Sequence, residues 1–72
     1  MTLLKLKNGQ KARVGTIMPS AVSYDRLLEL GFIEGEPVTL IRKAPLGGPI
    51  QISIRNTSYA LSREEAQHIT VI

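Results

Sequence analysis

Apolar and polar residues alternate in five stretches of this chain, and each stretch predicts a short β-strand. The pattern is clearest at residues 50–55, where three isoleucines alternate with three polar residues. This two-residue period is typical of an antiparallel strand with one face in water. It recurs in runs that are rich in β-branched or other apolar residues. These other predicted strands span residues 11–18, 38–43, 58–61 and 69–71.

A glycine interrupts the first predicted strand. After Gly15 the apolar pair Ile17-Met18 is out of step with Val14. A bulge or sharp bend near Gly15 restores the inward face and lets a small sheet curl. Ahead of this strand, Asn8-Gly9 predicts a turn. The short segment Leu4-Lys5-Leu6 before that turn is either the first arm of a hairpin or a simple lead-in.

The period changes to that of a helix over residues 21–30. Ser20 or Ser23 can cap its N-terminus through a hydroxyl. Gly31 supplies the left-handed residue that ends many helices, and Phe32 after it can fold back onto the helix, as in a Schellman motif. Three apolar side chains stand at i, i+3 and i+4, so they share one helix face: Tyr24, Leu27 and Leu28.

Two further segments separate the later strands. Residues 44–49 hold two prolines and two glycines around Leu46, a composition that predicts a loop. Ser62 and Glu65 fit a capping box, in which each side chain satisfies a free backbone N–H of the other residue. We therefore expect a brief helical turn before the last strand.

This order of elements predicts a mainly β fold in a single domain, residues 1–72. We expect a small SH3-like five-stranded antiparallel barrel, with one α-helix after the first strand and a short helical turn before the last. An OB-fold is the nearest rival, but its main helix usually lies between the third and fourth strands. Closure of the barrel also hides sheet edges.

Composition removes several classes of function. The 72 residues include no Cys and one His, so disulfides, thiolate chemistry and a metal site built from this chain alone are not expected. His68 with Glu64 and Glu65 is interpreted as a solvated cluster rather than a metal site. No Ser-His-Asp order or buried carboxylate pair suggests catalysis, so we predict no catalytic residues and no cofactor. No secretory or membrane-spanning apolar run is present, which favours the cytoplasm without membrane insertion.

The net charge of +3 leaves one alternative open. Basic residues are concentrated in the first strand and again near the end of the second, so a small nucleic-acid-binding barrel is the alternative function, although we expect no nucleic acid as partner. A peptide-binding SH3 domain is a weaker alternative, because three aromatic residues line a groove poorly. The basic residues of the nucleic-acid alternative are Lys5, Lys7, Lys11, Arg13, Arg42 and Lys43.

A set of sequence segments spread over most of the chain forms a recognisable combination. The segments are Arg-Leu-Leu-Glu-Leu-Gly-Phe-Ile-Glu-Gly at 26–35, then Val38 and Leu40, Ala-Pro-Leu-Gly-Gly-Pro at 44–49, Leu-Ser-Arg-Glu-Glu-Ala at 61–66 and Ile-Thr-Val at 69–71. Together they resemble the FeoA family, from about Leu6 to the C-terminus. The resemblance implies a non-enzymatic cytoplasmic accessory protein of bacterial ferrous iron uptake, with an SH3-like fold. It also implies docking to the membrane permease FeoB through that protein's cytoplasmic part, and exposed barrel loops allow a homo-oligomer.

The candidate partner-binding residues lie on the helix and on the Pro/Gly loop. Leu46 is either an exposed apolar anchor for a partner pocket or a lid folded onto the barrel end. Tyr24 and Arg26 either form a docking surface, with Arg26 in an ion pair to the partner, or are a core side chain and a solvated one. Gly47 and Gly48 shape the loop. Relatives are expected to carry Asp at the position of Gly48, so this chain lacks that carboxylate and its loop is expected to be more flexible.

Overall fold

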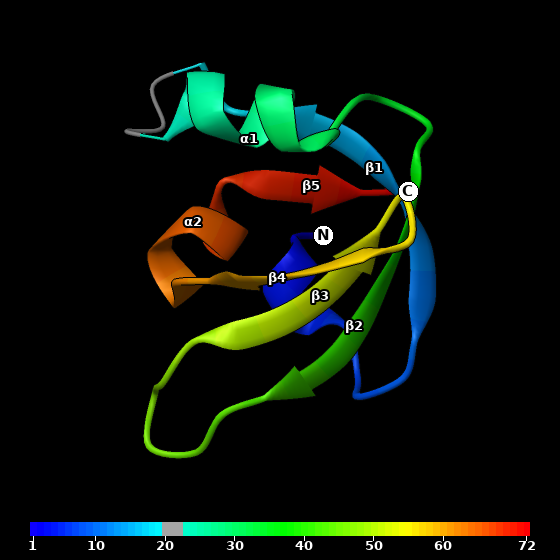
Figure 1. Cartoon of the computed structure of the whole chain (residues 1–72). Helices are drawn as coiled ribbons and strands as arrows, with labels where there is room; N and C mark the ends of the chain where they lie inside the picture. Colours follow the sequence, from blue (N-terminus) through cyan, green and yellow to red (C-terminus); the bar gives the residue numbers. More distant parts are fainter. Residues whose placement is uncertain (20–22) are drawn as a thin grey trace.

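The computed structural model describes residues 1–19 and 23–72, and its five strands form one curled antiparallel sheet (Figure 1). The strand order is β4-β3-β2-β1-β5, so β1 pairs with both β2 and β5. The predicted mainly β fold is confirmed. The strands are β1 Lys11–Ile17, β2 Pro37–Lys43, β3 Ile50–Ile54, β4 Thr57–Leu61 and β5 Ile69–Val71.

The predicted irregularity of β1 is confirmed at Gly15. Pairing of β1 with β5 shifts register between Val14 and Ile17. In the shifted stretch the Thr70 hydroxyl accepts the backbone N–H of Thr16 at 2.7 Å. The glycine is needed for space, because a Cβ there would lie 2.5 Å from Thr70 Oγ1. Val14 and Ile17 are both buried as a result, whereas Met18 is half exposed.

The helix after β1 is α1, Tyr24–Leu30. Its predicted start at residue 21 and the candidate cap Ser20 lie outside the described residues. Ser23 takes the cap position, but its side chain makes no capping hydrogen bond. Of the three side chains expected to share one helix face, Leu27 is fully buried, Tyr24 is half-buried and Leu28 is exposed.

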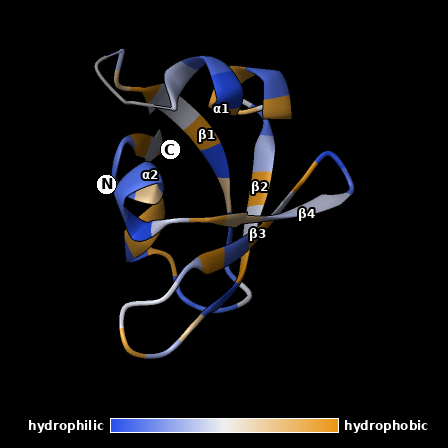
Figure 2. Cartoon of the chain, turned by 60° about the vertical axis from the view of Figure 1, so that its left-hand side comes forward, coloured by the Kyte–Doolittle hydropathy of each residue, from blue (hydrophilic) through white to orange (hydrophobic). Residues whose placement is uncertain are grey.

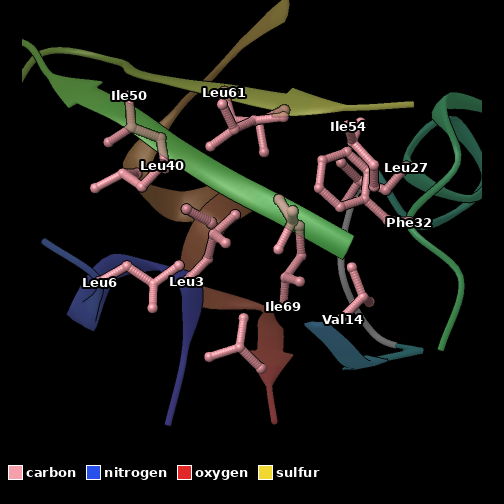
Figure 3. Close-up of a cluster of buried hydrophobic side chains, with 14 of the residues drawn as sticks. Leu3, Leu6, Val14, Leu27, Phe32, Leu40, Ile50, Ile54, Leu61 and Ile69 are labelled. Carbon is pink, nitrogen blue, oxygen red and sulfur yellow. The ribbon is translucent and has the colours of Figure 1, made fainter. Parts of the chain in front are cut away.

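The end of α1 follows the predicted Schellman pattern. Gly31 has a left-handed φ of 111°, and the N–H of Phe32 donates to the carbonyl oxygen of Leu27 at 3.1 Å. Figure 3 shows the Phe32 ring beside Leu27 and Ile54. The glycine thus turns the chain so that the only phenylalanine enters the core.

The leading segment is not the arm of a hairpin. Leu3–Lys5 forms a short 3-10 helix, η1, while the predicted turn follows at Asn8-Gly9, where Gly9 has a φ of 83°. The 3-10 geometry places residues three apart above one another. Leu3 and Leu6 therefore point the same way, and both are fully buried at the barrel end (Figure 3).

The predicted capping box begins the second helix, α2, Arg63–Gln67. The Ser62 hydroxyl accepts from the N–H of Glu65, and the Glu65 carboxylate accepts from the N–H of Ser62, each at 3.0 Å. Helix α2 contacts η1, β4 and β5 and so covers one end of the barrel.

The core is apolar throughout. Each strand contributes buried aliphatic side chains, and no polar side chain is buried among the described residues. Figure 2 shows the hydrophobic residues of the strands alternating with polar ones along the ribbon. None of the described helices is long and apolar enough to cross a membrane.

Candidate functional site

The predicted loop between β2 and β3 ends in a tight turn with Leu46 at its tip. The N–H of Gly48 donates to the carbonyl oxygen of Pro45 at 3.1 Å, and the two residues between them have positive φ, 58° for Leu46 and 73° for Gly47. Positive φ at both central positions is the pattern of a type I′ turn. The Leu46 side chain is 103% exposed, so the interpretation of Leu46 as a lid on the barrel is wrong.

An arginine of α2 holds the base of this loop. Arg63 Nε donates to the carbonyl oxygen of Gly48 and its Nη2 donates to that of Ala44, both at 2.9 Å. The N–H of Ala44 also donates to the carbonyl oxygen of Pro49 at 2.9 Å. The loop is therefore anchored on both sides, and only its apolar tip projects. Sequence reasoning missed Arg63, because nothing in its local pattern indicates a contact 15 to 19 residues away.

Gly48 has a packing role in the loop. A Cβ at this position would lie 3.0 Å from the Ala44 Cβ and 3.2 Å from the Pro45 carbonyl oxygen. Any side chain at this position, including the Asp expected in relatives, requires the neighbouring loop atoms to shift by a few tenths of an ångström. The greater flexibility expected from this glycine stays a prediction.

A shallow hollow of about 230 Å³ lies beside the loop. Ala44 and Pro49 line it from the loop, and the rest of its wall comes from β2, β3 and β4. Those strand residues are Arg42, Ile50, Gln51, Ser58, Tyr59 and Ala60.

The α1 candidates lie apart from the loop. Figures 1 and 2 both show α1 at the top of the molecule and the β2–β3 loop at the bottom, with α2 between them. Tyr24 is half-buried and packs against the core. Arg26 is not solvated alone, since its guanidinium forms an ion pair with Glu65, and about half of its side chain stays exposed. The structure thus brings Leu46, Gly47 and Gly48 together and places Tyr24 and Arg26 on a second surface.

Glu65 joins α1 to α2. Burial raises the pKa of its carboxyl group, but hydrogen bonds from the Ser62 backbone and the Ser23 hydroxyl, together with the Arg26 charge, outweigh burial and lower that pKa below its ordinary value. The carboxylate therefore stays ionised near neutral pH and holds both helix starts.

Two of the six basic residues of the nucleic-acid alternative make hydrogen bonds within the fold. Arg13 donates to the carbonyl oxygen of Gly35 at 2.8 Å, and the Lys43 ammonium donates to that of Leu4. These two cations are committed within the fold. Across residues 1–19 and 23–72, no three His, Asp or Glu side chains gather in a way that could hold a metal ion.

Comparison with known proteins places the chain in a family. The FeoA domain model matches residues 1–72. A "Fe(2+) transport protein A/Fe(2+) transporter FeoB fusion protein" of Porphyromonas gingivalis is 34% identical over 71 residues. That match covers 99% of this chain but only 8% of the relative's length.

Solved structures agree with the family match. FeoA of Stenotrophomonas maltophilia, described as complexed with zinc and as a procaryotic SH3 domain protein, is 33% identical with a TM-score of 0.88, covering 100% of this chain and 89% of that one. FeoA of Chlorobium tepidum is 35% identical with a TM-score of 0.88, covering 99% and 68%. A manganese-dependent transcriptional repressor, at 18% identity and a TM-score of 0.88 over 100% of this chain and 40% of that one, shares the fold alone.

The family match, the fused relative and the SH3-like neighbours confirm both the resemblance seen in the sequence and the barrel predicted from it. The chain belongs to the FeoA family, which is linked to ferrous iron transport.

Proposed function

We propose that this chain is a non-enzymatic, cytoplasmic accessory module of bacterial ferrous iron uptake that docks onto the cytoplasmic part of a FeoB-type permease. The P. gingivalis relative supports the partner, because it carries both names in one polypeptide. A domain covalently joined to a transporter in one organism is a reasonable partner for the separate transporter in another.

The observation that carries the proposal is the exposure of Leu46 on an anchored loop. An apolar side chain at a fully exposed tip gains free energy only when a partner buries it. The two hydrogen bonds from Arg63 already order the loop. Docking therefore costs little conformational entropy, which favours a binding role for the loop.

Helix α1 provides a second contact in this proposal. Arg26 is half exposed, with 52% of its side-chain surface accessible, whereas Glu65 is more shielded at 18%. A carboxylate of the permease would have to compete with Glu65 for the guanidinium. We therefore assign the loop the larger share of the affinity and α1 a smaller, salt-sensitive share.

Docking would regulate transport by differential affinity. If the module binds one state of the permease more tightly than another, it raises the population of that state by the ratio of the two affinities. Neither a bound metal nor a catalytic residue in the module is needed for such an effect.

The test is a pull-down of the cytoplasmic part of a FeoB-type permease with this chain, in each nucleotide state of its G-domain. Leu46→Ser is expected to weaken capture at least tenfold. Ile33→Ser is the matched control, because Ile33 is also exposed, at 51%, and lies outside the loop. Absence of capture in every nucleotide state by the folded module would refute direct docking, and light scattering on the same samples reports any homo-oligomer.

A further inference from the structure

One edge of the sheet, at β5, is covered by other residues of the chain, whereas the opposite edge, at β4, is not covered by any described residue. At the β5 edge, the N–H of Val71 donates to the carbonyl oxygen of Met1 at 2.9 Å, and Thr2 pairs with Thr70 as an isolated bridge. The chain's own N-terminus therefore covers that edge. At the other edge, β4 pairs with β3 on one side, and within the described residues no hydrogen bond reaches its outer side. The expectation that barrel closure hides the sheet edges is therefore wrong for β4, because β4 does not pair with β5.

The register identifies the backbone groups that point outward from β4. Ile54 pairs with Thr57 across a two-residue turn, Arg55-Asn56, in which both residues have positive φ. The pair that flanks such a turn is hydrogen-bonded, and hydrogen-bonded pairs alternate along an antiparallel ladder. Tyr59 and Leu61 therefore also bond to β3, whereas the N–H and C=O groups of Ser58 and Ala60 point away from it.

Nothing in β4 protects this edge. Sheet proteins usually blunt a free edge with charged side chains, proline or a bulge. Residues 57–61 include no charge and no proline. The β3–β4 ladder has no register shift, whereas the β1–β5 and β2–β3 ladders each have one. Ser58 and Ala60 are small and exposed, so another strand can approach closely.

The surroundings of the edge select the chemistry of an occupant. Residues 37–61 contain no Asp or Glu. Of their three basic residues, Lys43 donates to the Leu4 carbonyl oxygen, so the exposed positive charge of the β2–β3–β4 surface comes from Arg42 and Arg55. Arg42 has no ion-pair partner in the described part of the chain and lines the hollow beside the loop, together with Ser58 and Ala60. An occupant with acidic side chains is attracted, and an apolar side chain next to them fills the hollow.

We propose that β4 accepts an extended, acidic segment of a protein partner as an added strand, bound by the outward N–H and C=O groups of Ser58 and Ala60. Strand addition at an exposed edge is a general mode of peptide recognition, in which main-chain bonds supply affinity and neighbouring pockets supply specificity. A second copy of this chain fits less well, because it would bring two acid-free, positively charged sheets together. The identity of the partner rests on the proposed function, and the binding mode is additional to it.

The test combines amide hydrogen exchange with titration of the cytoplasmic part of a FeoB-type permease. In the complex, the amides of Ser58 and Ala60 are expected to exchange at least tenfold more slowly than in the free chain. Ala60→Pro removes the outward N–H and leaves the β3–β4 ladder intact, since proline is tolerated where an edge N–H faces solvent. This variant is expected to bind at least tenfold more weakly, and the control Ile33→Ser, at an exposed site outside β4 and the β2–β3 loop, within twofold of wild type.

A second pair of variants keeps the test decisive if Ala60→Pro misfolds. Arg42→Glu, which reverses the charge, is expected to weaken binding at least fivefold at low salt. Arg42→Gln, which only removes the charge, is expected to weaken binding by a factor less than half as large. Binding without protection of Ser58 and Ala60 would overturn strand addition and leave loop docking standing. No binding by the wild-type chain would instead refute the proposed function, and protection of the same amides that rises with concentration of the chain alone would identify a second copy as the occupant.

Discussion

Leu46 has a strained backbone conformation and an exposed apolar side chain, and neither feature stabilises the isolated domain. Its φ of 58° lies in the left-handed region, which costs a residue with a Cβ about 1 kcal/mol or more, and its side chain is fully exposed. Asn adopts this conformation more readily than Leu. We predict that Leu46→Asn raises the free energy of unfolding by about 0.5–1 kcal/mol and weakens capture of the permease at least tenfold.

Urea unfolding and the pull-down measure these two effects separately. The matched control is Ile33→Asn, which also replaces an exposed aliphatic residue and is expected to leave capture within twofold of wild type. A Leu46→Asn variant that is less stable than wild type would show that the tip is not strained, and one that binds normally would show that the tip is not used for docking.

Gly15 illustrates a constraint of space rather than of backbone conformation. An Ala methyl group would lie 2.5 Å from Thr70 Oγ1 and 3.2 Å from the Thr70 carbonyl oxygen. We expect Gly15→Ala to destabilise the domain by about 1–3 kcal/mol, as overpacking usually does. Denaturant unfolding of Gly15→Ala, Thr70→Ala and the double variant measures this cost. Because Thr70→Ala removes the closest atom, the cost of Gly15→Ala should fall in that background, and strictly additive costs would contradict the clash.

Residues whose roles depend on near neighbours could be predicted from the sequence. The bulge at Gly15 and the helix end at Gly31 follow from period and conformation within a few positions. Leu46 was placed in the right loop, but whether it projects or folds back depends on the turn and on Arg63. Since Arg63 lies on another element, its two hydrogen bonds to the loop have no local sequence signal.

At the scale of elements, α2 organises both candidate surfaces. Its Arg63 holds the β2–β3 loop, and its Glu65 accepts from Ser62 and from Arg26 of α1. The capping box was predicted, because its residues are three apart. The link to α1 was not, since the ion pair joins positions 39 residues apart. The short helix α2 therefore positions both the β2–β3 loop and α1, although the sequence pattern indicates no link between them.

This link predicts a dependence of stability on pH. The folded-state pKa of Glu65 is lowered, so its stabilising contribution is complete above the ordinary carboxyl value of about 4.3 and is lost as pH falls through the lower folded value. Glu65→Gln keeps an acceptor for the capping box but loses the ion pair. We expect it to cost about 0.5–1 kcal/mol at pH 7 and to lose less stability than wild type between pH 6 and pH 3.

Urea unfolding at a series of pH values measures this effect, and Arg26→Gln is the matched variant. It removes the same ion pair but leaves the hydrogen bonds from Ser62 and Ser23 that also lower the Glu65 pKa. Its pH dependence should therefore lie between those of wild type and Glu65→Gln. Identical slopes for all three proteins would mean that Glu65 titrates as a free surface carboxylate.

The N-terminal segment shows where prediction of elements failed. A stretch of six residues is too short for periodicity to distinguish a strand from a 3-10 turn: Leu4 and Leu6 fit the two-residue period of a strand, whereas Leu3 and Leu6 fit the three-residue period of a 3-10 turn. The structure resolves this through tertiary burial, because the spacing of three lets both leucines fill the end of the barrel. Local secondary-structure propensity carries no information about this space at the end of the barrel.

At the scale of the whole molecule, the barrel depends on this segment. A domain of this size has a free energy of unfolding of roughly 4–11 kcal/mol, and deleting a buried leucine side chain costs about 2–5 kcal/mol. Leu3 is completely buried although it is only the third residue of the sequence. We therefore predict that Leu3→Ala lowers the melting temperature by about 10 °C or more, as measured by thermal unfolding followed by circular dichroism.

The matched control is Leu28→Ala, which removes the same atoms from an exposed site and should change the free energy of unfolding by less than about 0.5 kcal/mol. Equal effects of the two substitutions would mean that the N-terminal segment adds little to the stability of the core. A large effect of Leu3→Ala alone would mean that this segment is part of the core, which holds both the loop and the β4 edge in place.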